Sequence, residues 1–79
     1  MSLRAEVRAS LLRHGVEPAE GETPETLRER LNDVYLEDVR RLKERQRAGE
    51  IALGDYAAAA EGLKRDYALL GLPLPLWSE

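Results

Sequence analysis

His14 is the first candidate for chemistry in this sequence, because histidine is the side chain that changes charge near neutral pH. It is the single histidine of the chain, and there is no cysteine. Catalysis needs a second reactive group beside the first, and no Ser-His-Asp pattern or phosphate-binding glycine loop supplies one. His14 directly precedes Gly15, and a histidine in the last turn of a helix interacts favourably with the free carbonyl groups there. We therefore expect a structural role for His14, no enzymatic activity, and no metal, cofactor or small-molecule substrate.

Asp38 is the second candidate, because it falls between Leu31 and Leu42 on the apolar stripe of a predicted helix. A carboxylate that faces a core is costly unless it is paired. It could act as a general base or contact a ligand. It could instead be held by Arg41, Arg45 or a tyrosine hydroxyl of the next helix. The sequence favours this pairing, since no second catalytic residue type is placed beside Asp38.

Five basic residues between positions 40 and 47 are the one feature that suggests nucleic-acid binding. At about 100° per residue, only Arg40, Lys43 and Arg47 share the outer face of the helix. Glu37 and Glu44 flank them at spacings that stabilise a helix, and the net charge of −3 disfavours binding to phosphates. We expect a solvated, ion-paired face. The alternative is an accessory nucleic-acid or regulator-binding domain that uses these three residues.

Length and composition indicate a single small domain. The 79 residues lack cysteine, so disulfides cannot stabilise the chain, and close helix packing, ion pairs or oligomerisation must do so. Most of the basic residues are arginine, a bias that suggests a heat-tolerant source. No run of about 18 apolar residues and no signal-peptide core is present, so we expect no membrane association and a cytoplasmic location.

Apolar residues recur with a helical period in three segments, and the sequence predicts an all-α fold. Ser2 is a good N-cap for the first helix, and Thr23-Pro24-Glu25 is a typical start for the second. The expected arrangement is a long antiparallel hairpin, a shorter N-terminal helix packed on it and an extended tail. The predicted elements are a helix over about 3–14, a linker over 15–23, a helix over about 24–48, a helix over about 53–70 and a tail over 71–79.

The connection between the two long helices has its own signals. Gly49 stands where a helix that ends in a left-handed residue needs glycine, so the second helix should stop at Ala48. If Ala52 is the N-cap of the third helix, Ile51 and Tyr56 occupy the two positions of a hydrophobic staple. Both features predict a tight, defined turn.

Residues 42–70 resemble the helical hairpin of the SHOCT-type (short C-terminal) modules. The shared pattern is an apolar helix, Gly-x-Ile, three residues, Tyr, six residues and Leu. This chain departs from it at Ala52, where serine or threonine is usual, and at Ala60, close to a common lysine. The resemblance implies a hairpin over about half of the chain, although unrelated stapled hairpins would converge on the same residues. The residues that carry it are Gly49, Ile51, Asp55, Tyr56 and Leu63.

Several apolar residues have no place in the predicted hairpin core. Leu36 points away from the apolar rows of its helix, and small residues on the third helix form a second face. The alternating prolines of residues 72–77 predict an extended tail, in which Trp77 either docks on the chain's own hairpin or hooks onto another subunit or protein. We expect a protein-interaction or self-association module, most simply a homo-oligomer. The candidate partner-binding residues are Leu36, Ala57, Ala58, Leu69, Leu74, Leu76 and Trp77.

Overall fold

The structure, a computed structural model, describes residues 2–79, and this part of the chain is helical without a strand. This confirms the predicted all-α class. None of the described helices is long and apolar enough to cross a membrane. The elements in chain order are α1 (Ala5–Arg13), α2 (Pro24–Arg47), α3 (Leu53–Asp66) and two short 3-10 helices, η1 (Ala68–Gly71) and η2 (Leu74–Leu76).

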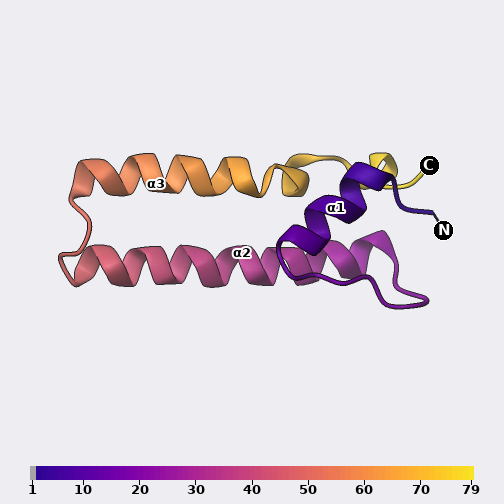
Figure 1. Cartoon of the computed structure of the whole chain (residues 1–79), viewed down its shortest axis with the longest axis horizontal. Helices are drawn as coiled ribbons and strands as arrows, with labels where there is room; N and C mark the ends of the chain where they lie inside the picture. The colour runs from indigo at the N-terminus through magenta and orange to yellow at the C-terminus, as the bar shows by residue number, and fades with distance from the viewer. Residues whose placement is uncertain (1) are drawn as a thin grey trace.

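The molecule is elongated, with extents of 45 × 18 × 16 Å. α2 and α3 lie side by side along the long axis and are joined at one end by residues 48–52, while α1 lies obliquely at the other end, near both termini (Figure 1). α1 is much shorter than α2, so it accompanies only part of the long helix pair. The two ends of the molecule therefore differ in how many elements pack together.

Local signals define α2 at both ends. The Thr23 side chain accepts a hydrogen bond from the Thr26 backbone N–H at 3.3 Å, and the Thr26 hydroxyl accepts one from the Thr23 N–H at 3.2 Å. Pro24 follows as the first helical residue, where its missing N–H has no helical partner to lose. At the other end, Gly49 has a φ of 78°, a left-handed conformation that ends the helix after Arg47.

The start of α1 differs from the prediction. The helix begins at Ala5 rather than near residue 3, and its N-cap is Arg4, which makes no side-chain capping bond, rather than Ser2. The reason is a tertiary contact: Leu3 pairs with Ser78 in an isolated antiparallel bridge, and the Arg4 N–H donates to the Trp77 carbonyl oxygen at 3.0 Å. The chain before α1 is therefore held extended against the C-terminal segment.

The end of α3 also differs from the prediction. The α-helix stops at Asp66 rather than near residue 70, and Tyr67 leaves the helical conformation with φ −106° and ψ 32°. In a continuous α-helix, Tyr67 and Leu69 would point to opposite sides, because two residues advance by about 200°. In the structure both are buried, at 4% and 9% exposure. The switch to the 3-10 turn of η1 lets both side chains pack in one core.

The C-terminal segment is not the predicted extended tail. It forms the second 3-10 turn, η2, in which the Leu76 N–H donates to the Pro73 carbonyl and the Trp77 N–H to the Leu74 carbonyl. The φ fixed by Pro75 suits a 3-10 turn as well as an extended strand. Burial of the large Trp77 indole at 0% exposure favours the turn, because it carries the side chain into the core.

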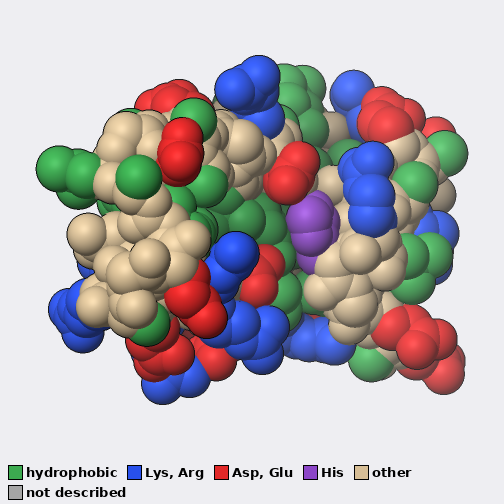
Figure 2. Space-filling view, turned by 60° about the vertical axis from the view of Figure 1, so that its left-hand side comes forward, with side chains coloured by type: hydrophobic (Ala, Val, Ile, Leu, Met, Phe, Trp, Pro, Cys, Tyr) green, Lys and Arg blue, Asp and Glu red, His purple; other side chains and the backbone are tan. Residues whose placement is uncertain are grey.

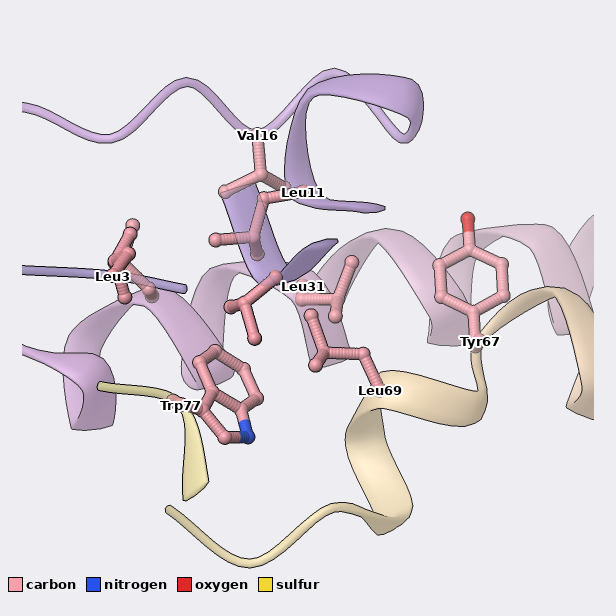
Figure 3. Packing of buried hydrophobic residues seen from close by; sticks show 9 residues of the cluster. Leu3, Leu11, Val16, Leu31, Tyr67, Leu69 and Trp77 are labelled. Carbon is pink, nitrogen blue, oxygen red and sulfur yellow. The ribbon is translucent and has the colours of Figure 1, made fainter. Parts of the chain in front are cut away.

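The core lies at the end of the molecule that carries α1. Figure 3 shows the Trp77 ring at one edge of the cluster, on the side of Leu31 of α2 and Leu69 of η1, with Leu11 of α1 farther away. α2 contributes buried residues only from its first two turns, and α3 contributes none. The buried residues are Leu3, Val7, Leu11, Val16, Leu27, Leu31, Tyr67, Leu69 and Trp77.

Candidate interaction surface

His14 has a structural place at the junction of α1 and α3. Its Nε2 lies 2.7 Å from the backbone oxygen of Asp66, and since a carbonyl only accepts, Nε2 donates this hydrogen bond. The imidazole also stacks on the Tyr67 ring, with 3.9 Å between ring centroids. The sequence placed His14 on the free carbonyls of its own helix, whereas the structure places it on the carbonyl end of α3. No group of three or more metal-ligating side chains occurs among residues 2–79.

Asp38 is paired, as the sequence favoured. The Tyr67 hydroxyl donates to Asp38 Oδ2 at 2.5 Å, and Arg41 Nη1 lies 3.6 Å from Oδ1. Burial raises the pKa of the Tyr67 hydroxyl, and the neighbouring Asp38 carboxylate raises it further. The Tyr67 ring also lies 5.2 Å from that of Tyr35. This arrangement fixes α3 to α2 and keeps the phenol protonated, which suits a structural contact better than proton transfer.

The predicted partner-binding residues are not brought together. Leu36, Ala57 and Ala58 are exposed on α2 and α3, with Leu36 at 53% exposure. Leu69 and Trp77 are buried in the chain's own core, where the Trp77 indole N–H donates to the Leu72 carbonyl at 3.0 Å. These two side chains are therefore not available to a partner in this structure. Of the other two tail residues, Leu74 packs against the core and Leu76 remains 42% exposed.

The basic residues of α2 lie among acidic ones. Arg40 pairs with Glu37 at 2.5 Å, and this hydrogen bond raises the pKa of Arg40. Lys43 and Arg47 are exposed. On the face shown in Figure 2, blue basic side chains alternate with red acidic ones rather than forming one basic field. On this face, acidic side chains therefore interrupt the positive charge of the basic ones.

The outer part of the helix pair is the most distinctive surface. We define the distal arm as residues 39–63, which comprise the last nine residues of α2, the connection and most of α3. No residue of the distal arm is buried. Val39, Leu42 and Leu63 are half-buried between the helices, and Leu53 at the start of α3 is 75% exposed. An apolar seam therefore runs along the arm with only two helices to cover it.

A groove of about 340 Å³ runs between α2 and α3 on one side of the arm. Its centre is apolar, with Leu42 and Leu63, while charged side chains stand at its ends. A Cβ at Gly62 would contact no atom beyond its own helix within 4 Å, which is also true of the other glycines. The lining residues are Asp38, Leu42, Arg45, Ala59, Gly62, Leu63 and Asp66.

Sequence reasoning missed this groove. The available signal was the recurrence of its residues at helical spacing, first Asp38, Leu42 and Arg45, then Ala59, Gly62 and Asp66. Each set lies along one helix face, but nothing in the sequence shows which faces the two helices turn toward each other.

Comparison of the chain with protein-family models, with curated proteins and with solved structures gave no match.

Proposed function

We propose that this chain is a small, non-enzymatic protein-interaction module that associates through its distal arm, with a second copy of itself as the partner. The observation that carries the proposal is the absence of any buried residue between positions 39 and 63. An antiparallel pair of helices buries only the stripe between them, and helical bundles complete such a core with further helices. A second arm supplies those helices.

The size of the exposed surface supports the same proposal. The accessible surface is 5433 Å², whereas a compact monomer of 8.9 kDa exposes about 4,800 Å². The radius of gyration is 14.5 Å, against about 11.6 Å for a compact domain of this length. A chain this small gains little stability from its own core, so the additional surface is a cost unless a partner covers it.

The arm and its border also expose apolar residues that do not form a single patch. Leu36, Leu53, Ala57 and Ala58 are all exposed. Small side chains on α3 allow another helix to approach closely, and the leucines add apolar area. The proposed surface is accordingly centred on the arm and excludes Leu69 and Trp77, which complete the chain's own core.

The test is the mass of the full chain in solution as a function of concentration. Sedimentation velocity and light scattering should give twice 8.9 kDa at high concentration and a return toward 8.9 kDa on dilution. Small-angle scattering of the associated species should give the dimensions of one particle in which the two arms lie against each other, not those of two separate elongated monomers. A mass of 8.9 kDa over the whole soluble concentration range would rule out self-association.

A further inference from the structure

The groove between α2 and α3 has charge of opposite sign at its two ends. The hydrogen bond between Tyr67 and Asp38 places the end of α3 beside the middle of α2, so Asp38 and Asp66 stand at the same end. Arg45 lies seven residues beyond Asp38 on α2, roughly 10 Å farther toward the connection. Leu42 and Leu63 lie between the two ends. The groove is thus acidic at the end nearer the core, apolar in the middle and basic toward the tip of the arm.

From this arrangement, and resting on the function proposed above, we propose that a second copy of the chain lies antiparallel across this groove, with Arg45 of each copy paired with Asp66 of the other. In a two-fold symmetric interface each contact occurs twice, once in each direction. When the two-fold axis that relates the copies passes through the apolar middle of the groove, the acidic end of one copy faces the basic end of the other. A parallel pairing brings like charges together, so the charges select the antiparallel one.

Asp66 forms no direct ion pair among residues 2–79, and the basic side chains that line a small hollow with it are Arg13 and Arg65. Asp66 is the last residue of α3, where the negative end of the helix dipole disfavours a carboxylate, and its side chain is exposed. Arg45 is exposed as well, and its one ion-pair partner among residues 2–79 is Glu50, at 3.7 Å. In the proposed pairing, the partner's Arg45 gives Asp66 a direct ion pair.

The middle of the groove fits a close helix crossing. Gly62 lies within α3 and lines the groove, and a Cβ at this position, as at the other glycines of the described chain, would contact no atom beyond its own helix within 4 Å. In the proposed pairing the partner's helix packs against Gly62, and Leu42 and Leu63 of both copies pack around it. An apolar centre with charged residues at its border is the usual composition of a protein interface.

The excess of accessible surface over a compact monomer is roughly 600 Å² per chain, similar to what each partner contributes to the smallest specific interfaces. This excess belongs to the whole elongated chain, and a second copy of the chain is large enough to cover it.

The experiment exchanges the charges and then mixes the variants. Arg45→Glu alone places two acidic residues opposite each other, and Asp66→Arg alone places two basic ones opposite each other. Each single variant should raise the dissociation constant of the dimer at least roughly tenfold.

Mixing the two variants restores both ion pairs. The glutamate introduced at position 45 of one chain meets the arginine introduced at position 66 of the other, while Asp66 of the first chain meets Arg45 of the second. A mixed dimer should therefore form with the affinity of the unaltered chain. Sedimentation velocity of each variant and of the mixture measures this.

Matched controls make the same charge changes outside the groove. Arg28→Glu and Glu29→Arg change exposed positions of α2 that lie outside the distal arm, and neither residue forms an ion pair among residues 2–79. Both should dimerise like the unaltered chain. Circular dichroism of every variant checks that the helices form, and recovery in the mixture cannot be produced by chains that fail to fold.

The outcomes separate this proposal from the one on which it rests. If the unaltered chain dimerises but both single variants still dimerise, self-association stands and the groove pairing is overturned. The same holds if the mixture remains monomeric. If the unaltered chain is a monomer throughout, both proposals fail together.

Discussion

The Tyr67 hydroxyl donates a hydrogen bond to Asp38 Oδ2 at 2.5 Å. Tyr67 itself is only 4% exposed. This contact lies at the boundary between the core and the distal arm. His14 stacks on the same ring and bonds to the carbonyl oxygen of Asp66. Tyr67 therefore holds α1, α2 and the end of α3 together, and the orientation of the arm depends on it.

We predict that the bond between Tyr67 and Asp38 stabilises the fold measurably. Tyr67→Phe and Asp38→Ala should each lower the free energy of unfolding by about 1–3 kcal/mol, because the acceptor is charged and half-buried. The double variant should lose less unfolding free energy than the sum of the two single losses, since the same hydrogen bond is removed in each. Urea unfolding of the four chains measures the coupling. Strictly additive losses would show that the two side chains do not interact.

A second prediction concerns alkaline pH. The pKa of Tyr67 is raised above its ordinary value of 10.0, first by burial and then by Asp38. The unfolded chain therefore loses the phenolic proton at lower pH than the folded chain, so this contribution is fully present below pH 10 and declines as the pH rises further. In urea unfolding from about pH 8 to pH 11, the free energy of unfolding should fall more steeply with pH for the unaltered chain than for Tyr67→Phe. Equal slopes would contradict the raised pKa.

The third prediction is that Trp77 is a core residue of its own chain. Trp77→Ala should cost about 3–5 kcal/mol, because it removes a fully buried indole. The neighbouring Leu76→Ala, at a side chain that is 42% exposed, should cost less than about 1.5 kcal/mol. Tryptophan emission should be blue-shifted and resistant to quenchers in water. A red-shifted, quenchable emission would mean that the tail is free in solution.

Replacing each of two glycines near the connection with alanine should change the stability of the protein in opposite directions. Gly49→Ala forces a side chain into the left-handed conformation and should destabilise the protein by about 1–2 kcal/mol. Gly54→Ala lies in the first turn of α3, where an added Cβ meets nothing within 4 Å, and should stabilise by a few tenths to about 1 kcal/mol. Thermal unfolding of both variants measures the difference. Equal effects would place the end of α2 elsewhere.

The last prediction addresses the nucleic-acid alternative. Replacing Arg40, Lys43 and Arg47 with glutamine should leave the helices and the association state unchanged, because these side chains are exposed and lie outside the groove. The unaltered chain should show no tight binding to DNA or RNA at physiological salt. Fluorescence anisotropy with labelled duplex and single-stranded probes checks this. Tight binding that the triple variant abolishes would make the basic face the functional surface.

The sequence alone determined the features of this protein that depend on neighbouring residues. The start of α2 follows from Thr23 and Pro24, and its end follows from Gly49, because caps are formed by groups within about four residues of each other. The pairing of Asp38 was also foreseeable, because an acidic residue on an apolar stripe must find a partner. Helical periodicity was enough for the all-α class.

The tertiary structure decided what depends on residues far apart in the chain. α3 ends at Asp66 because Tyr67 and Leu69 both enter one core, and α1 starts late because Leu3 pairs with Ser78. The groove exists only once α2 and α3 have docked, since residues of both helices then belong to the same surface. Helix periodicity gives the face of each helix but not its rotation against the next one. That rotation follows from packing at the core end, where the buried cluster and the bond from Tyr67 to Asp38 hold the helices in place.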